Sequence, residues 1–133
     1  MTDQTKIILK HNIELSLSSN APATDVAALI CDFFTNYYKD DDDRQYALLI
    51  FNEIYKKYSK DELPATFFSE FVRLYVNILR ENSSMMSSDT IDFICSNIID
   101  FADIAIKKNP KSNAPYLYLA RFYFRRNLCC VQK

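Results

Sequence analysis

Carboxylate pairs are the feature of this sequence that most resembles a chemical site. Asp89 and Asp92, and again Asp100 and Asp103, are three positions apart, so each pair shares one face of a helix. Such a pair could bind a divalent cation. A solvated helix face with acidic residues near its N-terminus is the favoured interpretation, because no histidine accompanies either pair and no glycine can shape a calcium loop. We predict no metal and no other cofactor.

His11 is the single histidine and the obvious candidate for a general base. Nucleophilic catalysis needs a serine or cysteine beside such a base in a recognisable motif, and none surrounds His11. We expect His11 to be a surface residue and the protein not to be an enzyme.

The four cysteines do not form a metal-binding pattern either. Structural zinc requires Cys and His at short spacings, and the sequence contains no CxxC pair. Cys31 and Cys95 are expected to be free, buried thiols in a reducing compartment. Cys129 and Cys130 lie shortly after Arg125 and Arg126, which makes palmitoylation conceivable, but an ordinary helix end or an artificial boundary is favoured.

Four consecutive aspartates, Asp40 to Asp43, could attract a basic partner. Negative charge also stabilises a helix N-terminus, so a helix cap followed by a solvated turn is the favoured interpretation.

The chain that positions these side chains has 133 residues and contains no glycine, which restricts the folds it can adopt. Glycine supplies the positive φ angles of tight hairpin turns and the close backbone approach of phosphate-binding loops. A P-loop, a dinucleotide-binding turn and a compact β-meander are therefore not expected. Because 49% of the residues are apolar, a core can form without disulfides or metals. We predict an all-α fold.

The charge balance restricts the partners. A formal net charge of −1 gives no global attraction to nucleic acid or anionic lipid. The N-terminus has no apolar signal sequence, and no uncharged stretch reaches the length of a membrane span. We expect an intracellular protein, cytoplasmic or nuclear, with no membrane partner.

Apolar residues at helical spacing predict about six helices, joined by Ser, Asn, Asp and Pro. The first, over residues 6–18, is poorly periodic, and a strand after Asn12 is an alternative. Residues 1–22 are assigned to an N-terminal segment and residues 23–133 to a helical domain. The other helices are expected near residues 24–38, 40–58, 64–82, 88–108 and 113–127.

Capping residues mark several predicted helix starts. Thr24, Ser88 and Asn113 are expected N-caps, and Ser59 with Glu62 fits a capping box. The helix over residues 64–82 is the most apolar, so we expect it to lie centrally and to be covered on more than one side.

The segment from Ala105 to Tyr123 carries a more specific pattern. A small residue and a proline precede a helix that presents an aromatic residue, a leucine, a small residue and a tyrosine at i, i+3, i+4 and i+7. In order, these residues are Ala105, Pro110, Tyr116, Leu119, Ala120 and Tyr123. The segment resembles the junction between two tetratricopeptide (TPR) repeats. The resemblance implies a stack of antiparallel helix pairs that serves protein binding.

Carried onto this chain, the TPR resemblance also implies a binding face. The first helix of each pair lines the concave side of a TPR stack, and the fourth and sixth helices take that place here. The implied partner-binding residues are Ser69, Arg73, Asn77, Leu117, Arg121, Phe124 and Arg125. Arginines beside aromatic rings can bind carboxylates, and the alternative is that these arginines are ordinary solvent-exposed residues of the helix surface. We expect a scaffold or adaptor that binds a protein or peptide.

Several alternatives stay open. The sixth helix has no following partner, so the domain is either capped there or incomplete at its C-terminus, and the helix could pair with its copy in a homo-oligomer. A Bcl-2-like regulatory bundle around the fourth helix is a second function. Single-stranded nucleic-acid binding by the basic C-terminal part is a third, which the overall acidity disfavours. The basic residues concerned are Lys107, Lys108, Lys111, Arg121, Arg125 and Arg126.

Overall fold

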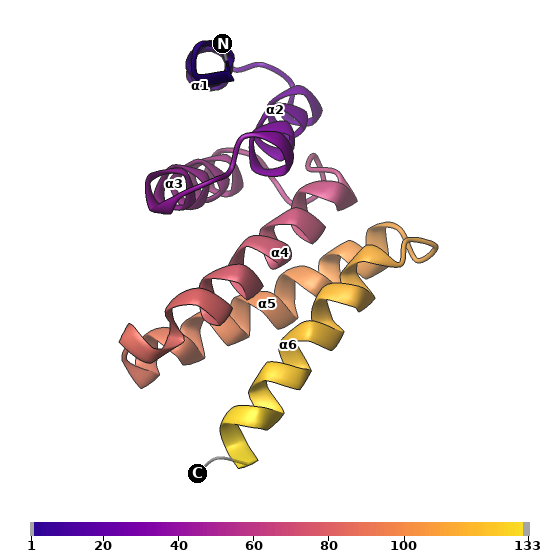
Figure 1. Ribbon diagram of the computed structural model, residues 1–133. Helices are drawn as coiled ribbons and strands as arrows, with labels where there is room; N and C mark the ends of the chain where they lie inside the picture. The colour runs from indigo at the N-terminus through magenta and orange to yellow at the C-terminus, as the bar shows by residue number, and fades with distance from the viewer. Residues whose placement is uncertain (1, 132–133) are drawn as a thin grey trace. The chain divides into compact units, whose positions relative to one another are not determined.

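The structure, a computed structural model, describes the backbone of residues 2–131 and the side chains of residues 4–122. Over that backbone the chain forms six α-helices and one 3₁₀ turn, with no strand (Figure 1). The elements are α1 (Thr2–Ser18), α2 (Ala23–Asn36), α3 (Asp41–Lys57), α4 (Ala65–Asn82), the 3₁₀ turn η1 (Ser83–Met85), α5 (Ser88–Lys108) and α6 (Ala114–Val131). The predicted all-α fold with six helices is confirmed. The alternative of a strand after Asn12 is wrong, because α1 continues unbroken to Ser18.

Asn20 explains how a chain without glycine ends α1. Its φ angle is 59°, in the left-handed region that usually selects glycine but that Asn also tolerates. The backbone N–H of Ala21 donates to the carbonyl of Ser16 at 3.0 Å, which satisfies a carbonyl of the last helical turn. Asn20 therefore ends the helix and turns the chain towards α2.

Two of the predicted N-caps are displaced by one or two residues. Pro22, not Thr24, precedes α2, and its carbonyl accepts from the N–H of Val26 at 3.2 Å. Ser87, not Ser88, caps α5, and its hydroxyl accepts from the N–H of Thr90 at 3.2 Å. Adjacent serines look alike in a sequence, and only the extended backbone of Ser87 distinguishes the cap.

The other two capping predictions concern the Ser59–Glu62 capping box and Asn113. Ser59 and Glu62 form the predicted reciprocal bonds, at 3.0 and 3.3 Å. They close a single turn, and α4 begins only at Ala65, after Pro64. Asn113 immediately precedes α6, and its carbonyl accepts from the N–H of Leu117 at 3.1 Å.

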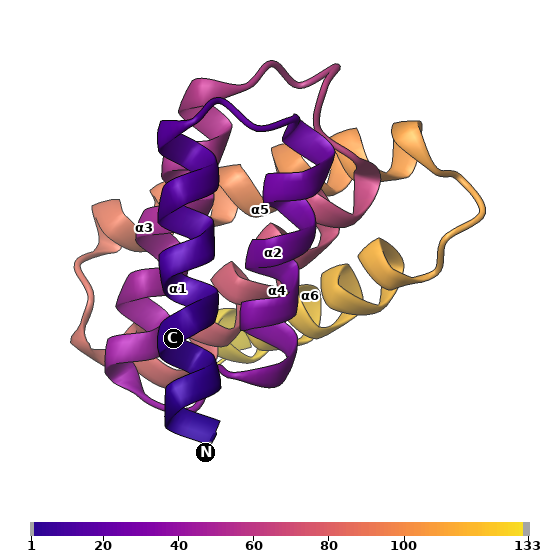
Figure 2. The same cartoon turned by 90° about the horizontal axis from the view of Figure 1, so that it is seen from above.

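The chain divides into two compact units, Met1–Phe67 and Phe68–Lys133, and the boundary falls in the first turn of α4. In the first unit α1 contacts α2 and α2 contacts α3, and Figure 2 shows α1 alongside α2. Aromatic rings fill its interior, with ring centroids 5.1 Å apart for Phe33 and Tyr46 and 5.2 Å apart for Phe51 and Phe67. The fully buried aliphatic residues around them are Ile13, Val26, Ile30, Ile54 and Leu63.

The second unit is organised around Phe101 of α5. Its ring stacks on Phe71 of α4 with centroids 4.6 Å apart, and Phe68 and Tyr75 of α4 lie 6.0 and 6.3 Å away. Helix α5 also contacts α6. Three consecutive residues of α4, 74–76, are all buried although they point in directions about 100° apart. The prediction that this helix is covered on more than one side is confirmed.

Within residues 2–131, no helix combines the length and the apolarity that a bilayer crossing demands.

Candidate functional site

Of the three predicted binding residues of α4, Ser69 is buried, and Arg73 and Asn77 form hydrogen bonds within their own helix. Ser69 is 6% exposed, so its hydroxyl is not available at the surface. The Nε of half-buried Arg73 donates to Glu70 Oε2 at 2.6 Å, and the Oδ1 of Asn77 accepts from Arg80 at 3.3 Å. The Glu70–Arg73 pair has the i, i+3 spacing at which opposite charges attract on a helix. Sequence reasoning could have found this pair and did not.

Helix α6 divides into a buried side and an open side. Pro115 and Phe122 are buried, whereas Tyr116, Leu117, Ala120 and Arg121 are exposed. We call these four exposed residues the outer face of α6. Its two large apolar members are strongly exposed, at 50% for Tyr116 and 59% for Leu117.

The remaining two predicted residues, Phe124 and Arg125, lie outside the residues whose side chains the structure describes. The described part of the predicted site on α6 therefore consists of Leu117 and Arg121, one helical turn apart.

Tyr118 is a residue that sequence reasoning missed. Burial raises the pKa of its phenol, and the charge of Glu70 raises it further, against smaller opposing effects of Arg73 and Arg121. The Glu70–Arg73 pair of α4 and Arg121 of α6 thus act electrostatically on one phenol. A phenol with the ordinary pKa of about 10 is already protonated at neutral pH, and the raised pKa of Tyr118 keeps it so, so the hydroxyl can donate a hydrogen bond.

The described side chains around Arg121 combine hydrogen-bond donors with apolar surface. Arg121 and Tyr118 offer donors, and Leu117 offers apolar surface. Among the described residues, no three or more His, Cys, Asp or Glu side chains are grouped so that they could hold a metal ion. Asp103 of the predicted carboxylate pairs forms an ion pair with Lys107 at 2.9 Å. His11 is exposed on α1, as expected.

The thiols conform to the expectation only in part. Neither Cys31 nor Cys95 forms a disulfide bond, but only Cys95 is buried, and Cys31 is partly exposed. Cys129 and Cys130 lie outside the described side chains.

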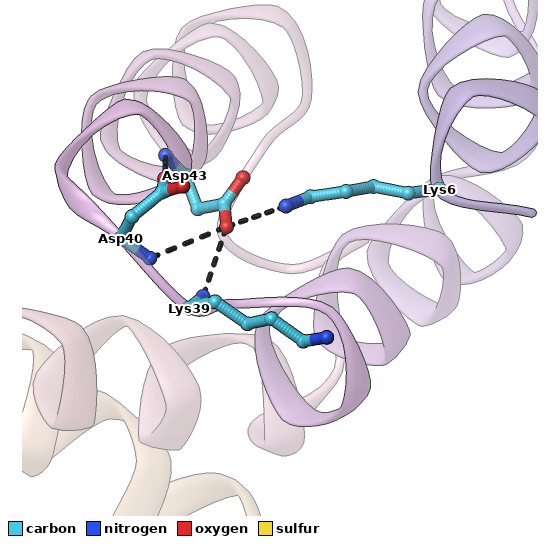
Figure 3. Close-up of polar contacts among 4 residues, drawn as sticks. All are labelled: Lys6, Lys39, Asp40 and Asp43. Atoms are coloured by element: carbon cyan, nitrogen blue, oxygen red, sulfur yellow. Dashed lines mark hydrogen bonds and ion pairs between the residues drawn. The ribbon is translucent and has the colours of Figure 1, made fainter. Parts of the chain in front are cut away.

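Asp43 of the acidic run belongs to a partly buried ion pair that the sequence did not reveal (Figure 3). Asp40 and Asp43 form the reciprocal bonds of a capping box for α3, which confirms the predicted cap. Asp43, however, is 1% exposed, so the expectation of a solvated turn is wrong for this residue. Its Oδ2 accepts from Lys6 Nζ at 2.6 Å and from the backbone N–H of Lys39 at 2.9 Å. The basic group that Asp43 attracts thus belongs to α1 of the same chain.

Stability in acid should depend on Asp43. Burial alone would raise the pKa of this carboxyl. The hydrogen bond from Lys6, the N–H of Lys39, the positive charge of Lys6 and the N–H of Asp40 outweigh burial and lower it. A carboxyl whose pKa is lower in the folded state stabilises the fold above its unfolded pKa of about 3.9 and loses that contribution as pH falls through the folded pKa.

We therefore expect the difference in unfolding free energy between the wild type and Asp43→Asn to be steady at neutral pH and to shrink below about pH 4. Urea denaturation at a series of pH values measures it. Asp42→Asn changes an exposed neighbour and should show no such dependence. A difference that widened in acid would contradict the assignment.

No family model matches this chain, and no curated protein or solved structure is significantly similar to it.

Proposed function

We propose that this protein is a non-enzymatic scaffold or adaptor that binds a protein or peptide through the outer face of α6. The observation that carries the proposal is the exposure of Tyr116 and Leu117 side by side with Arg121. Large apolar residues grouped with an arginine at the surface are typical of binding sites, in which tyrosine and arginine often dominate the affinity.

The TPR-like pattern adds support to this proposal. Ala105 is 1% exposed near the end of α5, and α5 contacts α6 after a short loop. Tyr116 and Ala120 occupy positions that a TPR repeat covers with its second helix, and both are exposed here. A partner segment that packs against them would bury the same surface.

A random peptide library displayed on phage and selected on the full chain tests the proposal. We expect Leu117→Asp to weaken the binding of the selected peptides at least about tenfold, because the substitution places a charge in the apolar contact. Leu49→Asp is the matched control, since Leu49 is 57% exposed on α3. Selected peptides that bind both variants as well as the wild type would refute the outer face as the binding site.

A Bcl-2-like regulatory bundle remains the second candidate, because α4 is buried on more than one side. Such a bundle would bind an amphipathic helix beside its central helix. Peptides that bind beside the central helix should bind Leu117→Asp as tightly as the wild type, so the same selection separates the two proposals.

A further inference from the structure

The charges of the chain are unevenly distributed along the second unit. No Asp or Glu follows Asp103, whereas seven Lys and Arg residues do. In the part with described side chains these are Lys107, Lys108, Lys111 and Arg121, and all four are exposed. Lys107 is paired with Asp103 at 2.9 Å. Among the described residues, Lys108, Lys111 and Arg121 form no ion pair, so the end of α5, the loop after it and the outer face of α6 each carry positive charge that no described carboxylate neutralises.

Arg121 differs from the other arginines whose side chains are described. Arg44 pairs with Asp41 at 3.0 Å, Arg73 with Glu70 at 2.6 Å, and Arg80 approaches Glu81 at 3.9 Å. Arg121 forms no ion pair with any carboxylate among the described residues. A guanidinium has five N–H donors that match a carboxylate in a bidentate pair, and Arg121 is an exposed residue.

Tyr118 adds a second donor close to Arg121. The two residues are three positions apart on α6, so their side chains are neighbours. Its protonated hydroxyl complements a carboxylate oxygen in the same way as the guanidinium does. Leu117 lies one turn from Arg121 on the exposed side. The outer face thus offers an apolar contact and a carboxylate-binding contact about 6 Å apart.

We propose that the partner is an acidic amphipathic protein segment, which places a carboxylate on Arg121 and an apolar side chain against Leu117. This inference rests on the proposed function and names the chemistry of its partner. Single-stranded nucleic acid would also satisfy the positive charge. Tyr116 offers a ring on which a base can stack. Nucleic acid fits less well because the adjoining Leu117 and Ala120 offer no planar surface for a further base, and the chain has a net charge of −1.

The selected peptides test this inference through their sequences and through one charge reversal. We expect them to be enriched in Asp and Glu next to apolar residues, and to bind Arg121→Glu at least about tenfold more weakly than wild type. Changing the critical acidic residue of such a peptide to Lys should restore binding to Arg121→Glu. Lys60→Glu, the same charge change at an exposed residue of the first unit, is the control and should leave binding unchanged.

Each other result decides against the inference in a distinct way. Neutral or basic peptides that lose binding on Leu117→Asp but not on Arg121→Glu would overturn it and leave the proposed function intact. Peptides insensitive to both substitutions would overturn both. Oligo-dT that binds more tightly than every selected peptide, and that depends on Arg121, would assign the surface to nucleic acid. Self-association in sedimentation that Leu117→Asp abolishes, without any peptide bound, would assign it to a second copy.

Discussion

Phe101→Ala is expected to destabilise the second unit by about 3–5 kcal/mol, the cost typical of removing a buried phenylalanine ring. Phe101 is 5% exposed, and its ring lies 4.6 Å from that of Phe71 with an interplanar angle of 23°. Deleting it removes the contact between α5 and three aromatic rings of α4 and leaves a cavity that neighbouring rings fill only in part. Urea denaturation followed by circular dichroism measures the loss.

Phe93→Ala provides the matched control on the same helix. Phe93 is 63% exposed, so its removal should change the unfolding free energy by about 0.5 kcal/mol or less. Similar losses for the two variants would contradict the placement of Phe101 at the centre of this unit.

Asp43→Ala is expected to lower the unfolding free energy of the first unit by about 3 kcal/mol, at the lower end of the range for breaking a buried ion pair. The substitution leaves three donors without this acceptor: the ammonium of Lys6 and the backbone N–H groups of Lys39 and Asp40. The side chain of Lys6 is 18% exposed, so water compensates part of the loss. Hydrogen exchange should show the largest increase in rate in α1, which loses its link to the start of α3.

Two companion variants isolate the ion pair from the cap. Asp42→Ala removes an exposed carboxylate from the same turn and should leave stability nearly unchanged. Lys6→Met should lower the unfolding free energy less than Asp43→Ala does, because the Asp43 carboxylate still accepts hydrogen bonds from two backbone N–H groups. If Asp42→Ala cost as much as Asp43→Ala, the effect would belong to the negative charge at the helix N-terminus and not to the buried pair.

Local signals explain which parts of the fold the sequence could predict. Apolar spacing of 3.6 residues located helices α2 to α6, and the Ser59–Glu62 capping box was visible as a short motif. Helix α1 was ambiguous for a physical reason: Ile7, Ile8 and Leu15 are exposed, so its apolar residues do not follow one buried face. Its anchoring depends on Lys6, on buried Ile13 and on Lys10, whose Nζ lies 4.5 Å from the Tyr46 ring centroid.

The candidate site was predictable only where it depends on neighbours in sequence. The exposed pair Leu117 and Arg121 shares one helix, and the Glu70–Arg73 pair could have been read from its spacing. Tyr118 could not, because its environment arises from residues of α4 about 45 positions earlier in the sequence. The Lys6–Asp43 pair spans 37 positions and likewise exists only through tertiary packing.

Hydrogen exchange of the full chain, with and without a selected peptide, tests the central claim most directly. The account predicts that bound peptide slows exchange in α6 around residues 116–121 and leaves α1 to α3 unchanged. Protection confined to the first unit, with α6 exchanging as in the free protein, would contradict a binding surface on the outer face of α6.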